Sequence, residues 1–201
     1  MAFTYFFRDL QTLELIIEHL NTFISGRSNI KIWDAGCAFG PEPYSLAILL
    51  SEKMGKFSFK NVKIYATDID ISNQFEDIIK NGIYPYNELQ RIPTEILKKH
   101  FTNIGNEKFQ ISEDLRSKII YKREDLTKLN PIGTELSLIL CKNVLLHLSA
   151  KERVDVIKMF HTALSEGGLF ATEHTQKMPE ELTDYFTPMQ TNAQIFKKIT
   201  K

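Results

Sequence analysis

The residues with the clearest chemical potential form a glycine-containing run at positions 34–40, Asp-Ala-Gly-Cys-Ala-Phe-Gly. The run follows a short apolar segment and precedes a helical one, so it predicts a strand-to-helix turn. At such a turn, Gly36 and Gly40 let the backbone adopt strained dihedral angles and approach a ligand closely. The run therefore predicts a loop that binds a nucleotide or nucleoside, although glycines at this spacing can also serve tight packing alone.

A second acidic residue, Asp68, stands at the end of the next predicted strand. In doubly wound α/β folds, an acidic group at this place can accept hydrogen bonds from ribose hydroxyls. Asp68 could instead cap the following helix, a role that Asp70 or Ser72 could equally take. Together with the glycine loop, Asp68 predicts a ligand that contains ribose.

The loop lacks the residues that hold phosphate. It departs from G-x-G-x-x-G, and no lysine or hydroxyl residue follows Gly40 as in a P-loop. Glu42, at the start of the next helix, would repel phosphate but would suit an amino or sulfonium cation. S-adenosylmethionine (SAM) matches, because it has a ribose, no phosphate and a positively charged head. Glu42 could otherwise simply complement the helix dipole.

The elements that must position these residues alternate between strand and helix. Apolar residues at helical spacing from Phe6 to Ile24 predict a first helix, which Gly26 ends. Further helices are predicted at residues 43–54, 73–80 and 150–164, and strands at 30–33, 62–67, 136–141, 169–173 and, antiparallel, 193–199. This order predicts one α/β domain over residues 1–201, with a mainly parallel sheet and flanking helices.

Residues 85–122 are less regular. We expect a short helix at residues 94–101, followed by strands at 109–111 and 119–121 that pair with each other as a small hairpin.

Composition narrows the range of partners. The 25 basic and 25 acidic residues cancel, so nothing favours a nucleic acid. The longest apolar run, residues 44–50, is far shorter than the roughly 20 residues of a membrane-spanning helix, and the N-terminus lacks the features of a signal peptide, so we expect a cytoplasmic protein without membrane insertion. Cys37 and Cys141 lack metal-ligand spacing, so we expect reduced thiols and no metal.

Several segments together resemble the CheR-type chemotaxis protein-glutamate O-methyltransferases. Residues 4–9, TYFFRD, are similar to the family's T-x-F-F-R followed by an acid, and residues 32–47 are similar to its W-S-A-G-C-S-T-G-E-E-P-Y-S block. Weaker matches lie at residues 66–70, 82–84, 125–126 and 141–144. The resemblance implies a Rossmann-like class I SAM-dependent methyltransferase with a small β-subdomain at about residues 100–122. It also implies S-adenosylhomocysteine (SAH) as product and a protein acceptor such as the cytoplasmic domain of a chemoreceptor.

The resemblance also implies roles for individual residues. Asp68 would bind the ribose, and Arg8 would lie near the methionine end and the reacting centre. Arg8 can hold a carboxylate with two hydrogen bonds, although it could also be a surface ion pair. The residues expected to bind the cofactor are Thr4, Arg8, Asp34, Gly36, Glu42, Asp68, Asp125, Leu126, Lys142 and Asn143.

Departures from the family pattern leave the methyl acceptor open. Lys142 replaces an arginine, and His147 replaces a tyrosine beside the expected acceptor, so the expected catalytic residues are Arg8 and His147. His147 could be a general base for a hydroxyl or amine acceptor, or a packing histidine. Asp125 replaces an asparagine but can still bind the adenine amino group. Glu173 and His174 stand in place of a Ser-Glu pair and are secondary candidates.

The sequence begins directly at the T-x-F-F-R segment, without the family's N-terminal helical domain. Either that domain has been removed or the chain is a stand-alone variant with another substrate. Two alternatives to protein-glutamate methylation therefore remain: a methyltransferase of small molecules with the same fold, and a catalytically silent module that binds SAM or docks to a partner.

Overall fold

A computed structural model describes residues 4–200, and within them the chain forms a seven-stranded sheet and a separate three-stranded sheet. The strand order in the large sheet is β6 (Ile119–Arg123), β2 (Val62–Asp68), β1 (Ile30–Ala35), β7 (Leu136–Cys141), β8 (Leu164–Thr172), β10 (Ile195–Lys198) and β9 (Phe186–Pro188). The first five strands run parallel, and β10 pairs antiparallel with both β8 and β9. The predicted mainly parallel α/β sheet is thus confirmed.

The helices are α1 (Leu10–Ile24), α2 (Pro41–Phe59), α3 (Phe75–Asn81), α4 (Tyr86–Leu89), α5 (Thr94–His100), α6 (Glu113–Arg116) and α7 (Ala150–Ala163), with 3-10 turns η1 (Leu126–Lys128), η2 (Leu145–His147) and η3 (Glu180–Tyr185). The five predicted helices lie close to their expected places, and the structure adds two short helices, α4 and α6, and three 3-10 turns that were not predicted. The first helix begins at Leu10 rather than at Phe6, because Phe7 and Asp9 have φ angles of 57° and 60°, which a right-handed helix cannot contain.

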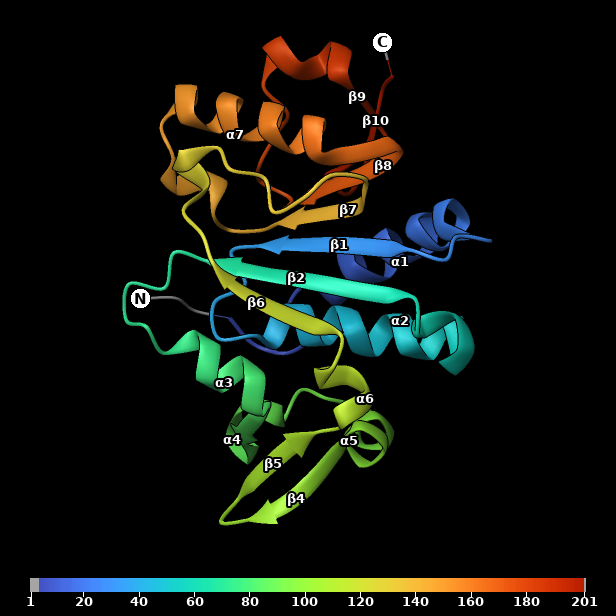
Figure 1. The fold of residues 1–201 in the computed structure, drawn as a ribbon, viewed down its shortest axis with the longest axis vertical. Helices are drawn as coiled ribbons and strands as arrows, with labels where there is room; N and C mark the ends of the chain where they lie inside the picture. The colour runs from blue at the N-terminus through green and yellow to red at the C-terminus, as the bar shows by residue number, and fades with distance from the viewer. Residues whose placement is uncertain (1–3, 201) are drawn as a thin grey trace.

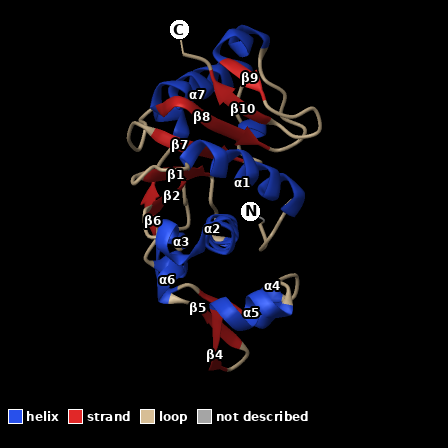
Figure 2. Cartoon of the chain, turned by 90° about the vertical axis from the view of Figure 1, so that its right-hand side faces the viewer, coloured by secondary structure: helices blue, strands red, loops and turns tan. Residues whose placement is uncertain are grey.

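Alternate residues of the central strands face different helices. Ile32 of β1 packs in one apolar cluster with residues of α1 and α2, whereas its neighbour Trp33 packs in another with residues of α7. Helices therefore cover both faces of the sheet, with α1 and α2 on one side and α7 on the other (Figures 1 and 2). Burial on both faces explains why β7 is apolar almost throughout.

The expected hairpin of residues 109–111 with 119–121 is wrong. In the small sheet, β5 (Lys108–Ile111) lies between β3 (Ile83–Pro85) and β4 (Phe101–Gly105), and β6 instead joins the large sheet parallel to β2. The helix α6 separates β5 from β6, so no tight turn can pair them. The small sheet spans residues 83–111 and lies at the lower end of Figure 1.

Parallel strands end at a common edge, and this edge collects the chemically important loops. The loops that follow β1, β2, β6 and β7 all leave the left-hand edge of the sheet in Figure 1. In residues 4–200, no helix is long and apolar enough to span a bilayer. The expectation that the chain has no signal peptide rests in part on residues 1–3, which lie outside the described residues.

Candidate active site

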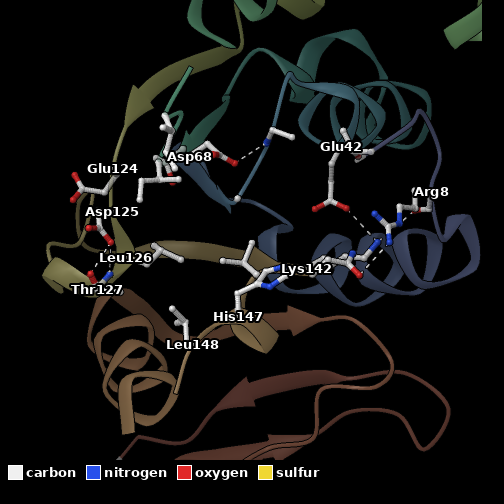
Figure 3. A pocket seen from close by; sticks show the side chains of 18 residues that line it. Arg8, Glu42, Asp68, Glu124, Asp125, Leu126, Thr127, Lys142, His147 and Leu148 are labelled. Atoms are coloured by element: carbon white, nitrogen blue, oxygen red, sulfur yellow. Dashed lines mark hydrogen bonds and ion pairs between the residues drawn. The ribbon is translucent and has the colours of Figure 1, made fainter. Parts of the chain in front are cut away.

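A cavity of about 520 Å³ opens at this edge of the sheet (Figure 3). Ligand sites in proteins have volumes of roughly 300–1,000 Å³. Its lining includes ten residues that the sequence singled out: Thr4, Arg8, Gly36, Glu42, Asp68, Asp125, Leu126, Lys142, Asn143 and His147. The fold thus brings together residues that lie far apart in the chain, such as Arg8 and Asn143, which are 135 positions apart.

The loop after β1 approaches the loop after β7 very closely. A Cβ atom on Gly36 would lie 2.1 Å from Cγ2 of Val144, and its φ of 107° is one that L side chains rarely adopt. The backbone N–H groups of Gly36 and Cys37 donate to the carbonyl oxygen of Thr67 at 2.7 and 3.0 Å. Gly36 thus permits the tight packing that the sequence allowed, and it also lines the cavity.

Asp68 is held at the cavity by backbone groups. Its Oδ2 accepts from the N–H of Ala38 at 3.0 Å and its Oδ1 from the N–H of Asp70 at 3.1 Å. The start of α3 is bound by Asp70 instead, which accepts from the N–H of Gln74 and of Phe75. The capping alternative for Asp68 is therefore wrong. An ionised carboxylate has about four acceptor positions, so Asp68 retains capacity for further donors.

A group of charged residues, of which Glu42 and Lys142 are buried, forms the end of the cavity near α1. Nζ of Lys142 lies 3.2 Å from Oε2 of Glu42 and 3.6 Å from Oδ2 of Asp9, and only 1% of the lysine side chain is exposed. Lys142 also donates to the carbonyl oxygen of Arg8 at 3.4 Å. Nη2 of Arg8 donates to Oδ1 of Asn143 at 3.2 Å. Figure 3 shows Arg8, Glu42 and Lys142 together at this end.

Asp34 lies beneath the charged group rather than in the cavity lining. It is fully buried, and neither of its carboxylate oxygens has a hydrogen-bond partner among the described residues. Burial, with repulsion from Glu42, raises the pKa of Asp34 well above its ordinary value. Burial also raises the pKa of Glu42, although Lys142 opposes this change. The raised pKa favours the neutral, protonated form of Asp34.

The opposite end of the cavity is built around η1. Oδ1 of Asp125 accepts from the N–H of Thr127 at 3.0 Å and from its hydroxyl at 2.7 Å. These hydrogen bonds hold the pKa of Asp125 below its ordinary value. Leu126 is buried beside it, and Asp68 lies on the same side of the cavity in Figure 3. This end offers carboxylate acceptors beside an apolar wall.

His147 lies at the rim of the cavity. It ends η2, its backbone N–H donates to Val144 at 2.9 Å, and its side chain is exposed. This position differs from that of a buried packing histidine.

Apart from Leu126, sequence reasoning missed the larger apolar side chains of the lining, which are Ile69, Ile71, Val144 and Leu148. Ile71 is 80% exposed, so it contributes little to the core. Apolar residues in the polar stretch directly after a strand were the available signal, because the ends of parallel strands form the ligand edge of such folds.

The fold is shared with solved methyltransferases. Magnesium protoporphyrin IX methyltransferase from Synechocystis PCC 6803, with bound SAM, matches over 96% of this chain and 80% of its own at a TM-score of 0.52 and 17% identity. TrmN from Thermus thermophilus matches over 92% of this chain and 49% of its own at a TM-score of 0.51 and 15% identity. The fold is that of the class I SAM-dependent methyltransferases.

Sequence comparison then identifies the family. Residues 2–195 match the family described as CheR methyltransferase, SAM binding domain, and the chain belongs to this family. A chemotaxis protein methyltransferase of Borreliella burgdorferi is 33% identical over 182 residues, which cover 86% of this chain and 63% of the relative. Chemotaxis protein methyltransferase 2 of Vibrio cholerae is 27% identical over 181 residues, covering 87% and 62%. The chain thus spans less than two thirds of the length of these relatives.

The family's cofactor is SAM, in agreement with the sequence prediction, and the cavity fits it. Gly36 removes the side chain that would block the loop, Asp68 offers acceptors for hydroxyl groups, and Glu42 supplies a negative charge in place of any phosphate-binding residue. These carboxylate acceptors therefore suit a ribose and a cation.

Proposed function

We propose that this chain transfers the methyl group of SAM to a side-chain carboxylate of a protein, namely a glutamate in the cytoplasmic domain of a chemoreceptor. The observation that carries the proposal is the guanidinium of Arg8, which lines the cavity and is oriented by Asn143 at 3.2 Å. A guanidinium in this position can bind a carboxylate with two hydrogen bonds. The names of the relatives, chemotaxis protein methyltransferases, support this acceptor.

The residues of the chain divide the work between the two ends of the cavity. Asp68 would accept from the ribose, Asp125 and Leu126 would hold the adenine, and Glu42 would face the amino group, with Thr4 and Lys142 completing that wall. Bound there, SAM would supply an activated methyl group on a sulfonium ion that leaves as a neutral thioether.

A carboxylate acceptor needs no general base, because it is already ionised near pH 7. Arg8 would hold it in line with the methyl group, and the apolar side chains Val144 and Leu148 would exclude water. Alignment and desolvation would then provide most of the rate acceleration.

The position of His147 favours a second candidate. An exposed imidazole at the cavity rim could take a proton from a hydroxyl or amine acceptor, protein or small molecule. The chemistry of the product separates the two candidates, because a methyl ester is labile to base and a methyl ether or methylamine is not.

The first experiment is calorimetric titration with SAM and SAH of the wild type, Asp68→Ala and Asp114→Ala, the last an exposed carboxylate on α6. Asp68→Ala should weaken binding at least tenfold, about 1.4 kcal/mol, and Asp114→Ala should not. In the second experiment, radiolabelled methyl groups transferred to a chemoreceptor domain should be released as methanol by base. Base-stable label would reject the carboxylate acceptor, and binding without any turnover would favour a silent SAM-binding module.

A further inference from the structure

Glu173 is a buried carboxylate that the proposed function leaves unused. It directly follows β8, is 6% exposed and stands behind the cavity wall. Its Oε2 accepts from the backbone N–H of Asn143 at 2.8 Å and lies 2.7 Å from the hydroxyl of Thr172. Burying a carboxylate is unfavourable unless hydrogen bonds compensate it. Oε1 has no hydrogen-bond partner among the described residues, so the contacts of Oε2 are the ones that stabilise the buried group.

The partner of Glu173 has an unusual backbone. Asn143 has a φ of 59°, in the left-handed region that most L residues avoid and that asparagine tolerates best. Such a conformation persists where the surroundings hold it in place. The bond from its N–H to Glu173 fixes the backbone, and its side-chain Oδ1 accepts from Arg8 at 3.2 Å.

Thr172 in turn holds Glu173. The Thr172 hydroxyl lies 2.7 Å from both Oε2 of Glu173 and the carbonyl oxygen of Cys141. A hydroxyl has a single proton, so it donates to only one of them at a time. When the hydroxyl donates to Oε2, it restricts the rotamer of Glu173, which then presents Oε2 to Asn143.

We infer that Glu173 is a positioning residue: its carboxylate holds Asn143 in the left-handed conformation, and Asn143 then orients Arg8 at the methionine end of the cavity. The inference rests on the proposed function, since it assigns a role in binding the cofactor and aligning the acceptor. Glu173 itself touches neither.

The test is calorimetric binding of SAH to Glu173→Ala and Glu173→Gln, with thermal unfolding of each variant. Glu173→Ala should weaken SAH binding at least tenfold. Glu173→Gln should remain within threefold of the wild type, because the amide carbonyl can accept the same N–H. Rescue by glutamine distinguishes a hydrogen-bonding role from a requirement for charge.

A double-mutant cycle tests the route through Asn143. Glycine adopts the left-handed conformation readily, so in an Asn143→Gly background Glu173→Ala should cost less than threefold. Ser165→Ala is the matched structural control, since this buried hydroxyl on β8 donates to Leu136 at 3.0 Å, far from the cavity. It should lower the melting temperature and leave SAH binding unchanged.

Three results would overturn the inference: wild-type affinity in Glu173→Ala, equal losses in the Ala and Gln variants, or an undiminished loss in the Asn143→Gly background. Should Glu173→Ala not fold, Glu173→Asp replaces it, because its carboxylate is one methylene too short to reach Asn143. A wild-type chain that binds no SAH would overturn the proposed function as well, which keeps the two failures distinguishable.

Discussion

The two ends of the cavity hold their carboxylates in opposite ways. Asp34 and Glu42 are buried beside Lys142, and burial raises the pKa of both carboxyl groups. Asp125 is bound by the hydroxyl and N–H of Thr127, two residues away, and its pKa is lowered. The first end depends on contacts between distant segments, and the second on a local turn.

This difference predicts how far the effect of a substitution extends at each end. At the charged end each group compensates another, so one change alters the protonation and the stability of its neighbours. At the η1 end, the backbone already satisfies the carboxylate, so a change should affect ligand binding and little else. The following variants test this contrast.

Lys142→Met should have the largest effect. It leaves Glu42 and Asp34 buried without their cation, and breaking a buried ion pair costs about 3–5 kcal/mol. Urea unfolding at pH 7.5 should show a loss of this size, and SAH binding should be lost with it. Adding Glu42→Gln to Lys142→Met should recover part of the stability, because the uncompensated charge is removed.

The control is Lys151→Met, which removes the lysine of an exposed pair with Asp155 on α7. Surface pairs of this kind contribute about 0.3–0.5 kcal/mol. If Lys142→Met cost no more than Lys151→Met, the charged end would not depend on mutual compensation.

The sequence predicted the local parts of the site well. The glycine loop, Asp68 and Glu42 lie in short segments at strand ends, where residue type and spacing constrain the chemistry. The contact of Lys142 with Asp9 and that of Glu173 with Asn143 join segments far apart in the chain, and no periodicity encodes such contacts. The same limit explains why the predicted hairpin was wrong, because β6 pairs with the distant strand β2 and not with its neighbour in sequence, β5.

Asp34 shows a further limit of the sequence. Its place in the loop motif predicted a cofactor-binding residue, and the structure buries it one layer below the cavity. A motif gives the position of a residue along a strand end, but the direction of its side chain depends on the pleat of the strand and on what packs against it. Any role of Asp34 toward the cofactor therefore passes through Glu42.

Asp34→Asn should have an intermediate effect that depends on pH. The pKa of Asp34 is raised in the native state, so the unfolded chain loses this proton first as the pH rises above about 4. The stability of the wild type should therefore fall with rising pH until the native pKa of Asp34 is reached. The slope can reach about 1.4 kcal/mol per pH unit for one proton. Asparagine cannot ionise, so the free energy of unfolding of Asp34→Asn should not show this decline. Near pH 7 the variant should be more stable than the wild type.

Urea unfolding between pH 4.5 and pH 8 measures this difference, with Asp114→Asn as the control for removing one exposed carboxylate. A stability difference between wild type and Asp34→Asn that stays constant with pH would show that Asp34 is ionised in the native state. The charged end would then hold an ionised Asp34 beside Glu42 and Lys142 rather than a neutral one.

Thr127→Val should have the smallest effect, confined to the ligand. It removes the 2.7 Å hydroxyl bond to Asp125 and keeps the 3.0 Å backbone bond, so the carboxylate is less firmly oriented but still satisfied. SAH binding should weaken two- to threefold, about 0.5 kcal/mol, the pKa of Asp125 should rise in an NMR titration, and the melting temperature should hardly change. Thr183→Val, which removes a hydroxyl bond to Glu180 within η3, is the matched control and should leave SAH binding unchanged. A loss of stability in Thr127→Val as large as that of Lys142→Met would mean that the η1 end is no more local than the charged one.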